Sequence, residues 1–368
     1  MEGISPPYNN PILMETDHAE RTVDVIIPAR NEEDCLGRCL QSLTAQQGIS
    51  FQITVVDDGS TDRTRPIAES FPGVRVLSAG ELKPGMTGKV NALVTGAAGS
   101  AAEWLLFTDA DTFHYPGSLA AAVGEAETRK VDLLSYSPEQ ETSSWWELAV
   151  MPLVFADLVR TYSSERINDP TDPSVAANGQ YILVRREVYE ALGGHAALPL
   201  NVLEDIELAK IFKVSGHRIW FRHGAGLVRT RMYRTFSAMW EGWSKGLAIL
   251  FRRPILLAAR RALEFVAIAL LLTTGLVRMA QNHVGSGAAL FAAGTFFYLN
   301  FLLRIRQAHF PWKANLMAFI GLPIFVSLLL RSHLHFNRRG ELTWKGRKYA
   351  QSAPKAAVDS SIRKGDLR

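Results

Sequence analysis

The hydrophobic pattern divides the chain into two parts. In the first part, short and mostly apolar runs alternate with amphipathic stretches. The runs span 23–29, 53–56, 74–77 and 104–108. Such runs are typical of strands buried on both faces, as in parallel sheets. Strands that alternate with helical patterns predict an α/β domain with a parallel, doubly wound sheet and right-handed crossovers. Further strands are expected at 132–136, within 178–185, where a loop enters a strand, and at 217–223.

The second part contains three long apolar segments. They span 262–280, 286–304 and 314–331. A membrane-spanning helix needs about 20 mostly apolar residues, and each segment is near the short limit. We expect about three transmembrane helices, within 262–332.

The segment 236–261, which precedes them, has an amphipathic pattern. Apolar residues recur at helical spacing at Met239, Trp243, Leu247 and Leu250. We expect an interfacial helix that holds Trp240 and Trp243 at the level of the lipid headgroups, with Lys245 beside them. These three residues are candidates for contact with an acceptor or a membrane. The alternative is a helix in a soluble core.

Composition limits the remaining possibilities. The chain has 368 residues, a net charge of +4 and a sequence pI of about 9.0. The excess of basic residues lies near the apolar segments, which favours a membrane surface over nucleic acid. Cys35 and Cys39 do not suggest a disulfide framework. We expect disorder and no signal peptide in 1–20, an α/β domain over 21–235, and a basic tail over 333–368.

Acidic residues follow two of the predicted strands. Asp109 and Asp111 come directly after the run 104–108, and Asp57 and Asp58 after the run 53–56. Ligands of open α/β sheets bind at the carboxyl ends of the strands, so these carboxylates should meet at one rim. Asp109 and Asp111 are candidate ligands for Mg²⁺ or Mn²⁺, which prefer oxygen. The alternative is a solvated pair in a turn.

Other polar residues extend this hypothesis. Arg30 and Lys89 could face phosphate or base oxygens, because the sequence has no glycine-rich phosphate loop. Glu204 and Asp205 precede a helical pattern, where a carboxylate is stabilised by the helix N-terminus. Capping alone would explain them, but Asp205 could also take a proton from an acceptor.

Four motifs in order resemble family 2 glycosyltransferases with the GT-A fold. They are Pro28-Ala-Arg-Asn-Glu32, Asp57-Asp-Gly-Ser-Thr-Asp62, Gly88-Lys89-x-Asn91 and Asp109-Ala-Asp111. The resemblance covers about 23–245. It implies a Rossmann-like nucleotide-sugar domain, a nucleoside-diphosphate-sugar donor that is usually linked to UDP, a divalent metal, and inversion at the anomeric carbon.

The resemblance also implies roles for single residues. Donor-binding roles fall to the motif residues Pro28, Arg30, Glu32, Asp57, Asp58, Lys89 and Asp109. Asn178 and Gln180 would lie under the donor sugar, although a polar turn would also explain them. Asp205 would be the catalytic base, with Glu204 beside it. His223 could contact the metal or the diphosphate, whereas a lone histidine is more often structural.

A closer resemblance is to the bacterial carotenoid-acid (diaponeurosporenoate) and hopanoid-associated glycosyltransferases. It is carried by 231–245, by the three apolar segments and by Thr343-Trp-Lys-Gly-Arg-Lys-Tyr349. It implies a multi-pass enzyme of the bacterial inner membrane with a cytoplasmic catalytic domain and a lipid acceptor. Three full spans would, however, put the tail motif on the opposite side.

Two alternatives remain open. Processive synthases of this fold carry Gln-x-x-Arg-Trp, whereas this chain has Trp240-Glu-Gly-Trp243-Ser-Lys245, which favours the transfer of one sugar over a polysaccharide or polyprenyl-phosphate-sugar synthase. A catalytically silent membrane scaffold is the non-enzymatic alternative, and the complete set of Asp109, Asp111 and Asp205 argues against it.

Overall fold

A seven-stranded sheet in the order β3-β2-β1-β4-β8-β6-β9 forms the centre of the α/β domain. The computed structural model describes residues 22–198, 203–338, 341–344 and 347–350, with side chains up to residue 334. The strands are β1 (Thr22–Ala29), β2 (Ser50–Asp57), β3 (Val74–Ser78), β4 (Trp104–Phe107), β6 (Leu133–Ser137), β8 (Ile182–Arg185) and β9 (Ile219–His223). The predicted runs therefore become strands.

One strand departs from the expected parallel sheet. β8 is antiparallel to both of its neighbours, β4 and β6, while the other pairs are parallel. After β6, the chain passes through helices α5 (Trp145–Thr161) and α6 (Ser164–Asn168) and re-enters the sheet from the carboxyl edge. Because no crossover returns it to the opposite edge, β8 has to run backwards.

Helices cover both faces of the sheet. On one face lie α1 (Leu36–Thr44), α2 (Thr64–Glu69) and α4 (Ser118–Arg129), and on the other lie α3 (Gly88–Ala97), α7 (Arg186–Ala191) and α8 (Glu204–Val214). Gly96 lets α3 approach the sheet closely, because a Cβ there would lie 2.5 Å from Ile26 Cγ2. The mixed, Rossmann-like α/β fold class is confirmed.

A small second sheet adjoins the carboxyl edge. It contains β5 (Thr112–His114), β10 (Val228–Thr230) and β7 (Glu139–Gln140), in that order. Because β5 begins directly after Asp111, this sheet fixes the direction in which the chain leaves the two aspartates. β10 then leads to helix α9 (Phe236–Leu250).

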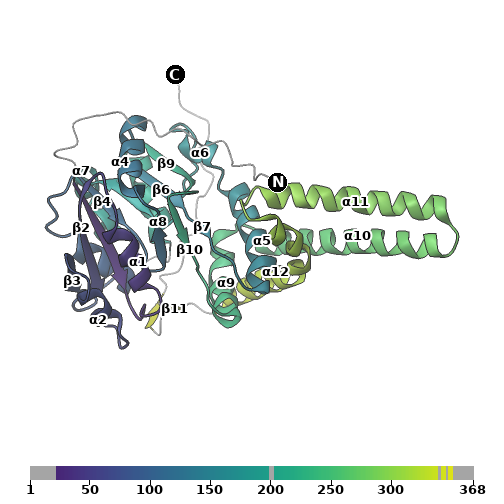
Figure 1. Cartoon of the computed structure of the whole chain (residues 1–368), viewed down its shortest axis with the longest axis horizontal. Coiled ribbons are helices and arrows are strands. Elements are labelled where there is room, and N and C mark those ends of the chain that lie inside the picture. Colours follow the sequence, from purple (N-terminus) through teal and green to yellow (C-terminus); the bar gives the residue numbers. More distant parts are fainter. Residues whose placement is uncertain (1–21, 199–202, 339–340, 345–346, 351–368) are drawn as a thin grey trace, which may run out of the picture.

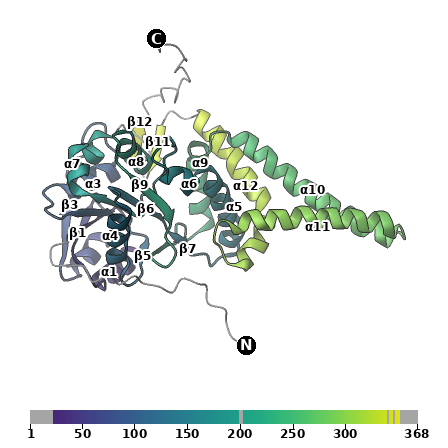
Figure 2. The same cartoon turned by 90° about the horizontal axis from the view of Figure 1, so that it is seen from above.

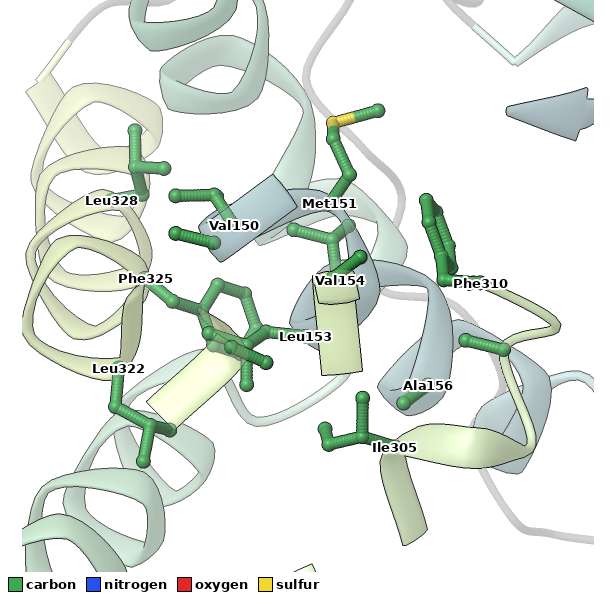
Figure 3. Packing of buried hydrophobic residues seen from close by; sticks show 14 of the residues in the cluster. Val150, Met151, Leu153, Val154, Ala156, Ile305, Phe310, Leu322, Phe325 and Leu328 are labelled. Atoms are coloured by element: carbon green, nitrogen blue, oxygen red, sulfur yellow. The ribbon is translucent and has the colours of Figure 1, made fainter. Parts of the chain in front are cut away.

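The C-terminal helices form a separate hydrophobic core around α5. They are α9, α10 (Pro254–Ala280), α11 (Val284–Arg306) and α12 (Trp312–Arg338). Figure 3 shows side chains of α5, among them Val150 and Leu153, packed between α12 and the end of α11. α12 approaches α5 so closely that a Cβ on Gly321 would lie 2.0 Å from the carbonyl oxygen of Ala149.

Helices α10 and α11 extend away from the rest of the protein as an antiparallel hairpin, in both views (Figures 1 and 2). Glycines at the contact let the two backbones approach: a Cβ on Gly275 would lie 2.7 Å from the backbone nitrogen of Phe291. Small residues at such contacts are typical of membrane helices. Apolar side chains nevertheless remain exposed on the hairpin, including Leu270, Phe296 and Leu303.

Two helices in the described part of the chain are long and apolar enough to cross a membrane, namely α11 and residues 312–334 of α12. The first of the three expected spans, 262–280, lies within α10, which is not in this group. Arg261 and Glu264 of α10 form ion pairs with Asp157 of α5 and Arg304 of α11 at the base of the hairpin.

After α12, two further strands, β11 (Glu341–Trp344) and β12 (Arg347–Ala350), form a hairpin. Both views place this hairpin on the side of the α/β domain, away from the far end of α10 and α11 (Figures 1 and 2). Of the expected tail motif, 343–344 and 347–349 are described as backbone. The disorder expected in 1–20 concerns residues outside the described part of the chain.

Candidate active site

Two cavities adjoin at the carboxyl edge of the sheet. The first has a volume of about 470 Å³ and is lined mainly by polar residues that follow β1, β2 and β4. The second has a volume of about 850 Å³ and lies between the sheet edge and the C-terminal helices. Five residues line both: Lys89, Asp109, Asp111, Glu204 and Met232. The two cavities therefore meet at a group of charged side chains.

The first cavity is shaped by contacts between the loops after β1 and β2. Asn31 has a φ of 53°, a left-handed conformation that asparagine tolerates better than most residues. Its Oδ1 accepts a hydrogen bond from the backbone N–H of Thr61 at 2.8 Å, and its own N–H donates to Ser60 Oγ at 3.1 Å. The Pro28–Glu32 and Asp57–Asp62 motifs thus support each other.

The donor-binding residues predicted from these motifs divide into two groups. Pro28, Arg30, Glu32 and Asp58 line the first cavity, where Arg30 Nη1 lies 3.6 Å from Asp58 Oδ2. Asp57 does not line it. Its carboxylate accepts a hydrogen bond from the Ser60 N–H at 3.0 Å. The structure therefore gives Asp57 a loop-supporting contact.

Lys89 connects helix α3 to carboxylates from two of the sequence motifs. Its Nζ lies 2.9 Å from Asp109 Oδ1 and 2.8 Å from Glu204 Oε1. The position of Lys89 follows from the start of α3, where Thr87 Oγ1 accepts a hydrogen bond from the Val90 N–H. Burial opposes the charge of Lys89, but the two carboxylates outweigh it and raise the pKa of Lys89 well above its ordinary value.

Asp111 has a different environment from Asp109. Gln180 Nε2 lies 3.5 Å from both carboxylate oxygens of Asp111, and no salt bridge to a cation is present for it among the described residues. Burial, together with the charges of Asp109 and Glu32, raises the pKa of Asp111 from 3.8 to about 7. The ionised carboxylate of Asp111 is therefore the one that would gain most from an added cation.

Asp205 lies in the first turn of α8 and lines the second cavity. Its Oδ2 accepts a hydrogen bond from the Gly179 N–H at 2.9 Å, and its Oδ1 accepts one from the Ile206 N–H at 2.8 Å. Burial and the neighbouring charge of Glu204 raise the pKa of Asp205 to about 7. A carboxylate with this pKa can accept a proton near neutral pH.

The second cavity has a polar end and an apolar wall. Asn178 and Gln180 line it, and Gln180 Nε2 lies 3.5 Å from the Asp111 carboxylate. The wall comes from α5, α9 and the loop between α11 and α12, and includes Phe155, Leu158, Val159, Trp243, Leu250, Phe310 and Pro311. The sequence analysis did not single out α5 or this loop, because no polar motif marks them.

The three candidate metal ligands, Asp109, Asp111 and His223, all line the second cavity. Among the described residues, no group of three or more His, Cys, Asp or Glu side chains is arranged to hold a metal ion. His223 lines the second cavity and stacks on His309, with ring centroids 4.6 Å apart. Burial lowers the pKa of His223 to about 4, so the ring is neutral at physiological pH. Its metal contact stays a prediction.

The α9 residues also differ from expectation. The face that carries Met239, Trp243 and Leu247 is buried in the core formed with α5 and α12, so Trp243 does not lie at a lipid surface. In the fold, this apolar face of α9 packs against other helices of the protein, whereas the sequence pattern predicted that it would contact a membrane. Trp240 and Lys245 line neither cavity: Arg331 lies over the Trp240 ring, and Lys245 pairs with Glu241 at 2.6 Å.

Comparison with known proteins shows which enzymes this chain resembles. A family model described as glycosyl transferase family 2 matches residues 24–193, which include both loop motifs, Lys89 and the two aspartates after β4. The protein is a glycosyltransferase, and its residues 24–193 resemble family 2. It is 27% identical to the 4,4'-diaponeurosporenoate glycosyltransferase of Staphylococcus aureus (strain MRSA252) over 344 residues, which are 90% of this chain and 89% of that protein.

Solved structures of two glycosyltransferases are more distantly similar to this glycosyltransferase. The mannosyltransferase PcManGT from Pyrobaculum calidifontis is 18% identical, with a TM-score of 0.48 over 90% of this chain and 92% of that one. A glucosyl-3-phosphoglycerate synthase from Mycobacterium tuberculosis is 22% identical, with a TM-score of 0.40 over 60% of this chain and 75% of that one. The fold assignment rests on the strand order described above.

Proposed function

We propose that this glycosyltransferase moves one sugar from a nucleoside-diphosphate sugar, with UDP as the expected nucleotide, to a membrane lipid, with inversion at the anomeric carbon. The observation that carries the proposal is the meeting of a polar cavity and an apolar-walled cavity at Lys89, Asp109, Asp111 and Glu204. A donor in the first cavity and an acceptor in the second would bring their reacting ends together there.

The first cavity suits a nucleoside diphosphate. The carboxylate of Asp58 can accept hydrogen bonds from base N–H or ribose hydroxyl groups, and Arg30 lies beside it. Pro28 and Glu32 complete this side of the cavity. Asn178 and Gln180, which line the second cavity, can bond to the hydroxyl groups of the transferred sugar. These amides each offer a donor and an acceptor.

The carboxylates fit a divalent cation. Lys89 forms ion pairs with Asp109 and Glu204 but not with Asp111, so a cation would offset the charge of ionised Asp111. Mg²⁺ or Mn²⁺ typically takes one or two carboxylates together with substrate phosphates. Asp109 and Asp111 would hold this cation, and His223 remains a candidate third ligand. When bound, the cation would stabilise the charge of the leaving diphosphate.

The second cavity suits the acceptor and the base. An acceptor oxygen attacks the anomeric carbon from the side of Asp205, the new C–O bond forms, and the diphosphate leaves with the electron pair of the broken bond. If the acceptor is a hydroxyl group, Asp205 takes its proton, with Glu204 and Lys89 setting the local charge. A carboxylate acceptor has no proton to give, so Asp205 would then orient the acceptor. The transition state has oxocarbenium character.

The acceptor is proposed to be a carotenoid acid, a hopanoid or another polyprenoid. The apolar wall of the second cavity supports this class, as does the name of the diaponeurosporenoate relatives. The exposed apolar side chains of the α10–α11 hairpin support a site in the bacterial inner membrane, with several membrane passes and the α/β domain in the cytoplasm. At about 1.5 Å per residue, the 23 residues of α11 are long enough for this.

The test is nucleotide release by the detergent-purified protein. UDP-, GDP- and dTDP-sugars are supplied with and without Mg²⁺ or Mn²⁺, and a total bacterial lipid extract serves as acceptor. We expect metal-dependent release of one nucleotide, stimulated by lipid, and a lipid product whose mass is increased by one sugar. Absence of turnover and of donor binding with all donors would refute the enzyme proposal in favour of a silent scaffold. Addition of many sugars to one acceptor would instead indicate a processive synthase.

A further inference from the structure

Three buried polar side chains flank the turn that carries Asp109 and Asp111. Thr108 precedes this turn, Thr112 and His114 of β5 follow it, and none of the three is more than 2% exposed. The two threonine hydroxyl oxygens lie 3.0 Å apart, and His114 Nε2 lies 3.2 Å from Thr108 Oγ1 and 3.1 Å from Thr112 Oγ1. The three side chains therefore form a closed triangle of polar atoms at the base of the turn.

The contacts of this triangle determine where its protons lie. Thr108 Oγ1 donates to the carbonyl oxygen of Gln180 at 2.8 Å, and Thr112 Oγ1 donates to the carbonyl oxygen of Asp109 at 2.8 Å. Because a hydroxyl group has one proton, both threonine oxygens can only accept a hydrogen bond from His114. Burial lowers the pKa of His114 to about 3, so the ring is neutral and has one proton. That proton must be on Nε2, and Nδ1, which has no partner among the described residues, is the unprotonated nitrogen.

The two threonines hold the backbone on two sides of the Asp111 carboxylate. The carbonyl oxygen of Asp109 also accepts a hydrogen bond from the Thr112 N–H at 3.3 Å, which closes the turn that contains Asp111. Gln180, whose carbonyl oxygen is held by Thr108, places its side-chain nitrogen 3.5 Å from both oxygens of that carboxylate. The triangle thus holds both the turn with the two candidate metal ligands and the residue that contacts one of them.

The place of His114 is set from outside the triangle. Its backbone N–H donates to Ser42 Oγ of α1 at 3.0 Å, and its ring packs on Tyr181, with centroids 5.6 Å apart. Apolar residues of the same volume could fill this space, but they would exert no directional hold on the carbonyl groups of Asp109 and Gln180. A buried hydrogen-bond network that is satisfied keeps its members in one arrangement, and a cation site needs ligands that are held in place before the cation arrives.

We propose that His114 is a positioning residue for the binding of the cation. By donating its Nε2 proton to both threonine hydroxyl groups, it directs their own protons to the carbonyl groups of Asp109 and Gln180. The carboxylates of Asp109 and Asp111 then keep one separation, ready for a divalent cation. His114 acts through its neighbours, since it lines neither cavity. The inference rests on the proposed function, because it assumes that the two aspartates hold the cation.

The test is the affinity of detergent-purified variants for Mn²⁺, measured from the EPR signal of the free ion. The side-chain nitrogen of glutamine reaches about as far from the backbone as Nε2 of histidine, whereas that of asparagine reaches only as far as Nδ1. We expect His114→Asn to raise the Kd for Mn²⁺ about tenfold, the effect of one lost hydrogen bond, and His114→Gln to stay within about twofold of the wild type. Thr112→Val should also raise this Kd, because it removes the proton that holds the Asp109 carbonyl group, whereas Thr112→Ser should not.

His195→Asn is the matched control. His195 is also buried, with 1% of its surface exposed, and its ring also contacts a hydroxyl group, that of Tyr189 at 3.0 Å, but it lines neither cavity. This variant should lose stability without a change in the Kd for Mn²⁺.

The inference is overturned by a wild-type Kd for His114→Asn, by equal losses for the asparagine and glutamine variants of His114, or by the same loss for His195→Asn. If the His114 variants do not fold, the Thr112 pair decides: a loss confined to Thr112→Val supports the inference, and equal Kd values for the two variants overturn it. A wild-type protein that binds no Mn²⁺ and releases no nucleotide with any donor would instead overturn the proposed function, and this inference with it.

Discussion

Replacing Asp111 by asparagine should stabilise the metal-free protein while abolishing its response to a metal. The pKa of Asp111 is raised from 3.8 to about 7 by burial and by the charges of Asp109 and Glu32. The folded state therefore favours the protonated carboxyl group. Protonated Asp111 makes its full contribution to the stability of the folded state below about pH 4, and this contribution is lost as the pH rises through about 7. Asparagine resembles the protonated form and does not ionise.

The size of the effect follows from the pKa. A shift of about three units, at about 1.4 kcal/mol per unit, gives an upper limit of about 4 kcal/mol for the cost of ionised Asp111. The side chain is partly exposed, so solvent screens the neighbouring charges. We expect an increase of about 1–2 kcal/mol in the free energy of unfolding for Asp111→Asn above pH 7, and a smaller increase at lower pH.

Asp109→Asn is the matched control, and we expect it to change the free energy of unfolding in the opposite direction. Asp109 lies 2.9 Å from Lys89 Nζ, so its removal leaves the partly buried ammonium group with Glu204 as its carboxylate neighbour. Breaking such an ion pair destabilises the folded state. We expect a lower free energy of unfolding for Asp109→Asn, although it too removes one carboxylate from the same rim.

The assay is thermal unfolding, followed by tryptophan fluorescence, at several pH values between 4.5 and 8 in the presence of EDTA or of saturating Mn²⁺. Mn²⁺ should stabilise the wild-type protein near pH 8 and less so below pH 6, because protons compete for Asp111. The reasoning is refuted if both variants shift in the same direction, if the gain for Asp111→Asn is independent of pH, or if that variant keeps the full response to Mn²⁺.

Three further predictions concern other parts of the protein. Asp205→Asn should keep donor binding but lower transfer to a hydroxyl acceptor at least 100-fold, with Glu207→Gln as the control in the same helical turn. In the wild type, kcat/KM for such an acceptor should rise with pH up to about 7, which is the pKa of Asp205, and then level off, because the base must be ionised. A kcat/KM that does not change with pH would count against Asp205 as the base. Arg261→Ala should lower the free energy of unfolding by about 3–5 kcal/mol, because it leaves Asp157 and Glu264 without this partner, whereas Arg260→Ala, at an exposed site, should change it little. Gly321→Ala should separate α12 from α5 and lower thermal stability, and a wild-type unfolding midpoint would contradict the close packing against Ala149.

The sequence predicted the sheet and several of the residues that line the cavity at its carboxyl edge. A buried strand such as β4 is recognisable because each of its residues is apolar, and the residues that follow it must lie at the carboxyl edge of a parallel sheet. This reasoning placed Asp109, Asp111 and Asp58 correctly around one cavity. It placed Asp57 there as well, but consecutive residues of a turn point in different directions, and Asp57 faces the loop backbone.

Hydrophobic pattern alone could not tell which surface an apolar face meets. The spacing of Met239, Trp243 and Leu247 determined that α9 is amphipathic, but a lipid headgroup layer and a neighbouring helix place the same demand on that face. In the structure, this face of α9 packs in the protein core. Likewise, the antiparallel direction of β8 depends on the path of α5 and α6, which no local signal in β8 records.

By itself, the sequence determined the α/β class, the carboxylates at the strand ends and the presence of long apolar helices, because each follows from residue type and spacing along one segment. Only the tertiary structure decided that Lys89 joins Asp109 to Glu204, that Tyr233 rests on Gly242 beside Trp243, and that α5 forms a wall of the second cavity. These contacts connect segments far apart in the chain. They form only because the helices and strands that carry these residues pack close together.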